Sequence, residues 1–271
     1  MQATIAASIL FSLLSATAFL LVGRTVLRRS VSPDLRLPRD AFGAFWVALG
    51  ATTVFGAAMT AAARWLDPGL ELFVTLNLVT LLILCVGLWG LLFYLVFLYT
   101  DSRRAALPLA VGYLAFFGCL VYYVLSSRPV GVQLGRWGVE LEYARPIDSG
   151  PLYIAVILFL VLPQVLAGFA YLSLYPRVAD PLQKRRILIV SLSIILWFAT
   201  GFALASPELR RSDEWQLASR MIGLAATAAI YYAYAILRPG QGGPAPSEAS
   251  AGQAAAEGAE LPQRRKAMAV A

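Results

Sequence analysis

The chain has 271 residues, of which 59% are hydrophobic and 14% charged, and its net charge is +7. A soluble domain carries about 25% charged residues, so this composition excludes an ordinary water-soluble fold and predicts an all-α membrane protein. The absence of histidine excludes histidine-ligated haem, histidine metal sites and catalytic triads, and Cys85 and Cys119 alone are too few for a metal. We therefore expect no cofactor, no metal site and no enzymatic activity.

Seven apolar runs follow one another along the chain, each long enough for a membrane-spanning helix. They cover residues 3–23, 41–63, 72–100, 105–125, 151–175, 187–206 and 217–237. The third has 29 uncharged residues between Glu71 and Asp101 and, as a helix, would be roughly 43 Å long. We expect this run to lie at the centre of a seven-helix bundle. Trp46, Trp65 and Trp215 fall where interfacial belt residues are expected.

The charges between the runs predict the topology. Residues 24–40 form a basic loop with five arginines. Together with the third and fifth connections and the tail, this side carries fifteen Lys/Arg and seven Asp/Glu, a net +8, whereas the other side carries seven and eight, a net −1. Because cytoplasmic loops are basic, we expect the N-terminus outside and the C-terminus inside a prokaryote-like plasma membrane. Topology thus accounts for the positive charge, and we expect no nucleic acid partner.

The longest connection, residues 126–150, contains a hairpin pattern. The segments VGVQL and VELEY alternate apolar and polar residues on either side of Gly135-Arg136-Trp137-Gly138. We predict a small extracytoplasmic β-hairpin between the fourth and fifth helices that caps one mouth of the bundle. After the bundle, which we assign to residues 1–238, residues 239–271 have no apolar periodicity and are expected to form a disordered cytoplasmic tail.

Few polar side chains fall inside or at the ends of the runs, and these are candidates for ligand binding. The candidates are Glu71, Asn77, Tyr122, Tyr123, Tyr153, Gln164 and Arg220. Arg220 either extends to the lipid headgroups or pairs with Glu71 at the outer mouth of a cavity. Asn77 and Gln164 either form hydrogen bonds between helices or line an outward-facing pocket with the three tyrosines. Pro163 is expected to kink the fifth helix.

The same runs argue against several transport and photoreceptor functions. No carboxylate lies deep in any run, which argues against an ion path or a proton relay. The seventh run contains no lysine, which excludes a retinal bound covalently as in rhodopsins. A carrier or lipid-handling protein is disfavoured because matching broken helices do not recur in the two halves of the chain.

The junction before the sixth run has a distinctive sequence, ADPLQKRR at residues 179–186. Its junction residues are Asp180, Pro181, Gln183, Lys184, Arg185 and Arg186. Asp180 is predicted to be an N-cap and Pro181 the first helical residue. The three basic residues that follow are expected to hold the foot of the helix at anionic lipid.

This junction resembles the D-P-x-Q-[RK]-R-R segment of bacterial seven-helix sensor modules, the N-terminal membrane regions of many histidine kinases. Seven spans, an outer N-terminus, a large loop between spans four and five and the Gly150–Tyr153 start of span five also fit this family. The resemblance covers about residues 3–238. The family normally continues into a kinase or other output domain, whereas this chain continues into the tail. The resemblance therefore implies that the output comes from a separate protein.

Two functions remain open. The first is a non-enzymatic, receptor-like sensor module that receives a ligand or membrane signal in the outer half of the bundle, under the hairpin. It would pass the signal to a separate partner. The alternative is an accessory or scaffold subunit of a larger membrane protein complex. The expected partners are the lipid bilayer and either a cytoplasmic signalling protein or other subunits of such a complex.

Overall fold

The structure is a computed structural model that describes residues 2–31, 33–66, 69–100, 102, 104, 107–135, 137–144, 154–155, 157–203, 212–235 and 237. The predicted tail lies outside these residues. The helices are α1 (Gln2–Leu27), α2 (Pro33–Trp65), α3 (Leu70–Thr100), α4 (Leu107–Ser126), η2 (Ile157–Val161), α6 (Leu162–Ser173), η3 (Tyr175–Arg177), α7 (Pro181–Ala203) and α9 (Asp213–Ala235). The strands are β1 (Pro129–Leu134) and β2 (Val139–Tyr143).

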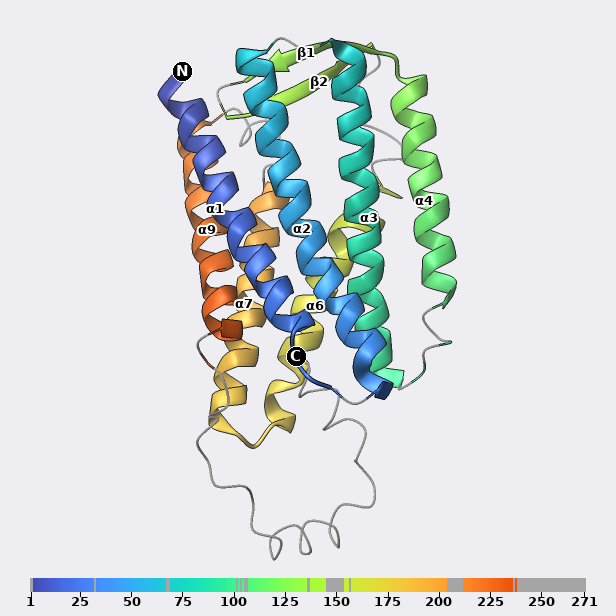
Figure 1. Ribbon diagram of the computed structural model, residues 1–271, viewed down its shortest axis with the longest axis vertical. Coiled ribbons are helices and arrows are strands. Elements are labelled where there is room, and N and C mark those ends of the chain that lie inside the picture. The colour runs from blue at the N-terminus through green and yellow to red at the C-terminus, as the bar shows by residue number, and fades with distance from the viewer. Residues whose placement is uncertain are drawn as a thin grey trace, which may run out of the picture.

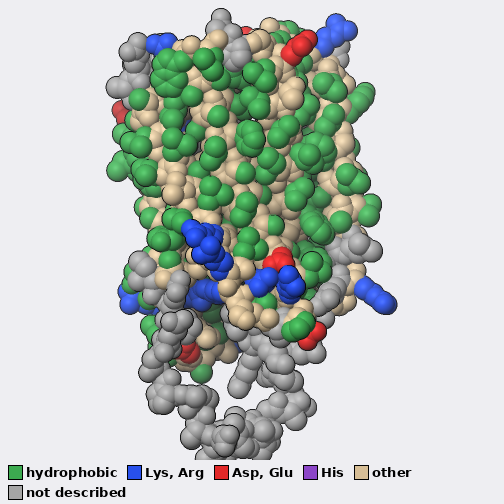
Figure 2. All heavy atoms as spheres, viewed as in Figure 1, with side chains coloured by type: hydrophobic (Ala, Val, Ile, Leu, Met, Phe, Trp, Pro, Cys, Tyr) green, Lys and Arg blue, Asp and Glu red, His purple; other side chains and the backbone are tan. Residues whose placement is uncertain are grey.

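Within the residues that the structure describes, five helical segments are long and apolar enough to cross a membrane: residues 4–27, 33–65, 70–100, 108–126 and 157–177. The helices α7 and α9 are not among them, although each has 23 residues. Figure 2 shows hydrophobic side chains over the middle of the molecule and a band of Lys and Arg near its lower end. These features agree with an all-α membrane protein. The count of seven spans and their orientation remain predictions.

The contacts between the long helices that the structure describes form a closed ring, and α4 lies outside it. In the ring, α1 packs on α2, α2 on α3, α6 on α7, α7 on α9, and α9 on α1, while α3 contacts α6. The remaining long helix, α4, packs against α3 at the edge of the bundle (Figure 1). We call the end that carries the strands the hairpin end. The opposite end, where α1 ends and α2 begins, is called the basic end.

The contact between α2 and α3 depends on glycine. A Cβ atom at Gly90 would lie 2.6 Å from the backbone oxygen of Ala41, and one at Gly87 would lie 2.5 Å from the Cβ of Ala48. Both distances are shorter than real Cβ atoms show to non-bonded heavy atoms. The two helices therefore approach each other more closely than a side chain at either glycine would permit.

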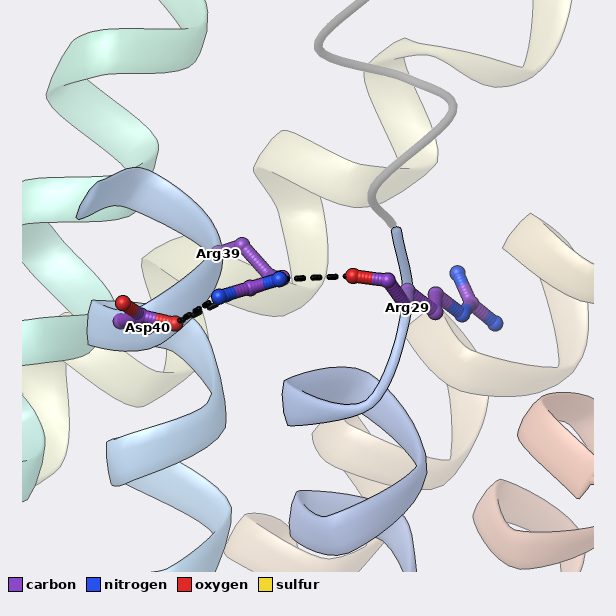
Figure 3. Close-up of polar contacts among 3 residues, drawn as sticks. All are labelled: Arg29, Arg39 and Asp40. Carbon is purple, nitrogen blue, oxygen red and sulfur yellow. Dashed lines mark hydrogen bonds and ion pairs between the residues drawn. The ribbon is translucent and has the colours of Figure 1, made fainter. Parts of the chain in front are cut away.

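The predicted basic loop at residues 24–40 is largely helical, because the end of α1 and the start of α2 both lie within it. Pro33 occupies the first helical position, where its missing N–H leaves no bond unmade. Arg39 donates to the backbone oxygen of Arg29 at 2.7 Å and to Asp40 Oδ1 at 2.9 and 2.7 Å (Figure 3). The loop prediction was wrong because arginines also suit a helix that continues past the hydrocarbon core.

The predicted β-hairpin is confirmed. β1 and β2 are antiparallel, with Leu134 opposite Val139, and the Gly135 N–H donates to the Gly138 oxygen at 2.9 Å. The hairpin lies across one end of α2 and α3 (Figure 1). It is therefore placed to cover the interior of the ring at that end.

Aromatic side chains fill the ring towards the basic end. The Phe42 ring stacks on Tyr94 with centroids 4.5 Å apart and lies 6.0 Å from Tyr171 and 6.1 Å from Tyr234. Trp46 packs beside them and is 1% exposed. The prediction that Trp46 belongs to an interfacial belt was therefore wrong, because its ring faces the centre of the bundle and not the lipid.

Candidate functional site

A cavity of about 500 Å³ lies among α1, α2, α3, η2, α6, α7 and α9, a size typical of small-molecule sites. Most of its wall is apolar and comes from Phe11, Phe19, Leu49, Leu84, Trp197, Phe198 and Leu224 among others. The polar residues of the wall are Ser12, Ser15, Thr52, Thr53, Gln164, Thr200, Ser219 and Arg220. Two of the predicted candidates, Gln164 and Arg220, therefore line the same cavity.

Gln164 is placed by an interruption of regular helix. The π-helical η2 gives way to α6 immediately before Pro163, which has no N–H to offer the Phe159 carbonyl. The Tyr113 hydroxyl of α4 donates to that carbonyl at 2.9 Å. Gln164 Nε2 donates to the Leu160 carbonyl, while Oε1 is buried without a hydrogen-bond partner. The predicted distortion near Pro163 thus takes the form of a π-helical turn, a feature frequent at functional sites.

Arg220 lies near the start of α9 and binds the tip of the hairpin. Its Nη2 donates to the Trp137 carbonyl at 2.7 Å, and its guanidinium carbon lies 5.5 Å from the centroid of the Trp137 ring. Ser8 Oγ of α1 donates to the same carbonyl at 2.6 Å, and Trp137 Nε1 donates to Asp213 Oδ1 at 3.1 Å. Trp137 therefore fastens the hairpin to α1 and α9 at the end of the cavity where Arg220 lies.

The predicted pairing of Arg220 with Glu71 is absent, because Glu71 is exposed and Arg220 instead contacts Trp137. The alternative, in which Arg220 extends to the headgroups, is also not observed, since Arg220 Nε is buried and without a hydrogen-bond partner. Local spacing could not reveal the actual contact, because 83 residues separate Arg220 from Trp137.

Asn77 lines a second cavity, of about 320 Å³, beneath the hairpin together with Glu140 and Tyr143. Burial raises the pKa of Tyr143 above the usual tyrosine value, and the neighbouring Tyr123 raises it further. Tyr123 is half-buried, and its interaction with Tyr143 places it near this second cavity, whereas it is absent from the wall of the larger one. Asn77 and Gln164 therefore do not share a pocket.

The two remaining tyrosine candidates are Tyr122 and Tyr153. Tyr122 is 75% exposed on α4 and lines neither cavity, so it does not join Asn77 or Gln164 in an outward-facing pocket as predicted. Tyr153 lies outside the described residues. Of the predicted ligand-binding set, the structure brings together Gln164 and Arg220 in the larger cavity and leaves Glu71 and Tyr122 on the surface.

Sequence reasoning missed Trp137 and the hydroxyl residues of the cavity wall. Thr52 and Thr53 donate their hydroxyl protons to the Leu49 carbonyl at 2.9 and 2.7 Å. A threonine that can satisfy its hydroxyl on its own helix gives no indication in the sequence of what it faces. For Trp137, the sequence signal that could have indicated a contact with the bundle was the position of a large aromatic residue in the hairpin turn.

The predicted start of α7 is confirmed at the basic end. Asp180 Oδ1 accepts a hydrogen bond from the Leu182 N–H at 3.0 Å, as an N-cap does, and Pro181 is the first helical residue. Gln183 is half-buried in the first turn. The local signals of this junction therefore act as the sequence indicated.

The three basic residues after the cap do not share one environment. Arg185 is exposed, in agreement with a place at the membrane surface, and Lys184 Nζ lies 5.6 Å from the centroid of the Tyr175 ring. Arg186 is 8% exposed, and its guanidinium carbon lies 4.7 Å from the centroid of the Tyr234 ring. The prediction that Arg186 lies at the surface was wrong, because its position on the helix turns its side chain into the interior of the bundle.

No protein-family model, curated protein or solved structure matches the chain. Within the described residues, no three side chains of His, Cys, Asp and Glu lie close enough to hold a metal ion. The functional assignment therefore depends on the cavity and its contacts.

Proposed function

We propose that the chain is a receptor-like, non-enzymatic sensor module of seven spans in the plasma membrane and that its ligand site is the 500 Å³ cavity. The observation that carries the proposal is the pair of buried, unsatisfied polar atoms on residues of the cavity wall, Gln164 Oε1 and Arg220 Nε. Buried polar atoms are normally hydrogen-bonded, so a largely apolar cavity whose wall residues carry an unsatisfied donor and an unsatisfied acceptor favours a bound ligand.

The lining indicates the class of ligand. The apolar part of the wall suits a hydrocarbon chain, and the guanidinium of Arg220 suits an acidic head group. Gln164 Oε1 can accept a hydrogen bond from a hydroxyl or amide on the same molecule. We therefore expect an amphipathic carboxylic acid, a class that reaches such a site through the lipid.

The same contacts suggest how binding would be transmitted. An acidic ligand on Arg220 competes with the Trp137 carbonyl and would loosen the hairpin. Trp197 and Phe198 of α7 also line the cavity, and α7 is a single helix of 23 residues whose other end is the Asp180–Arg186 junction. A small shift of α7 would reach the basic end, and a separate cytoplasmic partner would then receive the signal.

Ligand binding can be tested with cis-parinaric acid, a fluorescent fatty acid excited by energy transfer from tryptophan. We expect saturable transfer in the purified full-length protein and about tenfold or more weaker binding to Arg220→Gln, since a hydrogen bond to a charged group contributes about 1.5–3 kcal/mol. Arg64→Gln removes a charge at the same end of the bundle but outside the cavity wall and should bind normally. Equal affinity of wild type and Arg220→Gln would contradict the proposal.

A pull-down from native membranes separates the sensor from the alternative function. Full-length protein is compared with a version truncated after Gly240. Recovery of a kinase, cyclase or response-regulator protein that depends on the tail supports the sensor. Stoichiometric recovery of respiratory, transport or envelope subunits with both versions supports an accessory subunit of a membrane complex.

A further inference from the structure

At the basic end, the ends of three helices bring two arginines to one buried tyrosine. The guanidinium carbon of Arg186, from the start of α7, lies 4.7 Å from the centroid of the Tyr234 ring near the end of α9. The guanidinium carbon of Arg29, just after α1, lies 5.5 Å from the same centroid. Tyr234 is 1% exposed, so two positive charges meet at the buried surface of one ring. We call these three residues, with Tyr94 and Tyr171, the arginine–tyrosine cluster.

Arg186 is the member whose charge lacks compensation. Its side chain is more than nine-tenths buried, and neither Nε nor Nη2 has a hydrogen-bond partner. A guanidinium remains protonated at any physiological pH, so Arg186 cannot relieve the cost by losing its proton. Burying a charge without a partner costs several kcal/mol, and the contact with the Tyr234 ring offsets only part of that.

The two unsatisfied Arg186 atoms, Nε and Nη2, indicate what kind of group would bind them. Nε–H and Nη2–H lie on one edge of the guanidinium plane and point in nearly parallel directions, an arrangement that grips an oxyanion with two hydrogen bonds. Arg39 uses the same edge in this structure, because its Nε and Nη2 donate to Asp40 Oδ1 at 2.9 and 2.7 Å (Figure 3). On Arg186 that edge is buried and has no acceptor.

The surroundings of Arg186 supply further donors. Tyr94, Tyr171 and Tyr234 are all buried, and their hydroxyl oxygens lack hydrogen bonds of normal geometry. The hydroxyls of Tyr94 and Tyr234 nevertheless lie near enough to Tyr171 to interact with it. Tyrosine hydroxyls and guanidinium groups that belong to one buried cluster can together satisfy the several oxygens of a tetrahedral anion.

The backbone holds Arg29 in place for this arrangement. Arg39 Nη1 donates to the Arg29 carbonyl at 2.7 Å, and Figure 3 shows the Arg29 side chain extending away from that contact. The link fixes the turn between α1 and α2, so the Arg29 guanidinium is directed to Tyr234 without having to order a free loop.

We propose that the arginine–tyrosine cluster is an anion site that binds a phosphate group, carried either by a lipid headgroup or by a free phosphate. Phosphate offers the oxygens that a guanidinium edge and tyrosine hydroxyls can share, and headgroup phosphates lie where arginines gather at the end of a bundle. Because Arg186 belongs to α7, Arg29 follows α1 and Tyr234 belongs to α9, the bound group would tie these three helices together at the basic end. The site is separate from the 500 Å³ cavity and does not depend on its ligand.

The test uses full-length protein that has been delipidated in maltoside detergent. Its thermal unfolding is followed with added inorganic phosphate, with chloride at equal ionic strength, and with phosphatidylglycerol. We expect phosphate or phosphatidylglycerol to raise the unfolding temperature saturably, whereas chloride does not. A response to inorganic phosphate identifies a free phosphate, and a response to phosphatidylglycerol alone identifies a headgroup.

Matched variants assign the effect to Arg186. Arg186→Gln should abolish the stabilisation, whereas Arg185→Gln removes the same charge from the exposed neighbour and should keep it. Without phosphate, Arg186→Gln should be at least as stable as wild type, because it removes an uncompensated buried charge. If that variant does not fold, Arg186→Lys keeps the charge but not the two-donor edge and should weaken binding about tenfold. Stabilisation of neither kind in wild type, or equal stabilisation of all the variants, would overturn the proposal.

Discussion

The Tyr113 hydroxyl donates a hydrogen bond to the backbone carbonyl of Phe159, to which Pro163 has no N–H to offer. Phe159 lies four residues before Pro163, so residue 163 offers its carbonyl no α-helical N–H, and the Tyr113 hydroxyl of α4 donates to this carbonyl at 2.9 Å. A buried acceptor left without a donor costs about 1–3 kcal/mol. Tyr113→Phe should therefore lower the free energy of unfolding by about that amount, measured by denaturant titration in detergent.

The same helix offers a matched comparison. Tyr122 also belongs to α4 but is exposed, so Tyr122→Phe should change stability by less than about 0.5 kcal/mol. Equal effects of the two substitutions on the free energy of unfolding would mean that the hydrogen bond from the Tyr113 hydroxyl makes no net contribution to stability.

Between elements, the contact of α2 with α3 is limited by backbone approach. Gly90→Ala would place a methyl group 2.6 Å from the Ala41 backbone oxygen, so the helices must separate. We expect a loss of about 1–3 kcal/mol, read as a lower unfolding temperature. Gly56→Ala on α2 meets nothing within 4 Å and should be neutral or slightly stabilising, because alanine favours helix. An unchanged unfolding temperature for Gly90→Ala would show that α2 and α3 can separate enough to accept the methyl group without loss of stability.

The hairpin provides an element that responds to pH. Burial raises the pKa of Tyr143, so the docked hairpin holds this proton more tightly than the undocked one. Docking is thus unaffected below about pH 10, the ordinary tyrosine pKa, and weakens as pH rises above it. Between pH 9 and 11, wild type should lose thermal stability more steeply than Tyr143→Phe, while Tyr122→Phe keeps the wild-type slope. Parallel curves for all three proteins would exclude a contribution from Tyr143.

For the whole molecule, the predicted topology places the hairpin end outside the cell and the basic end inside. In a background of Cys85→Ala and Cys119→Ala, a cysteine at Gly135 in the hairpin turn should react with a membrane-impermeant maleimide in intact cells. A cysteine at Arg104 at the other end should react only after lysis. The reverse pattern would invert the orientation, and labelling of both sites in intact cells would argue against a complete crossing.

The elements with local signals were predictable, whereas the direction of side chains within apolar helices was not. Alternation around the Gly135–Gly138 turn was enough to predict the hairpin, and Asp180 with Pro181 was enough to predict the start of α7. Arg185 and Arg186 are neighbours in one basic triplet, but about 100° of helix rotation places one outside and one inside. Where almost every residue of a helix is apolar, hydrophobicity gives no polar face from which to infer that rotation.

The candidate site was predicted in part for the same reason. Gln164 and Arg220 stood out because polar groups are rare in these runs, and both line the larger cavity. Their partners could not be inferred, because the Arg220–Trp137 contact joins distant parts of the chain and depends on how the ring closes.

The ring of helices also sets an order of events during synthesis. α1 leaves the ribosome first and α9 comes last of the described helices, yet the two are neighbours in the finished bundle. A nascent chain that ends before residue 213 lacks α9. It therefore lacks the part of the cavity wall that includes Arg220, and Trp137 has no Arg220 to bind. If the proposed ligand binds in this cavity, only a fully translated bundle can hold it, and a cell rich in that ligand would protect completed molecules from membrane proteases while leaving truncated ones to be degraded.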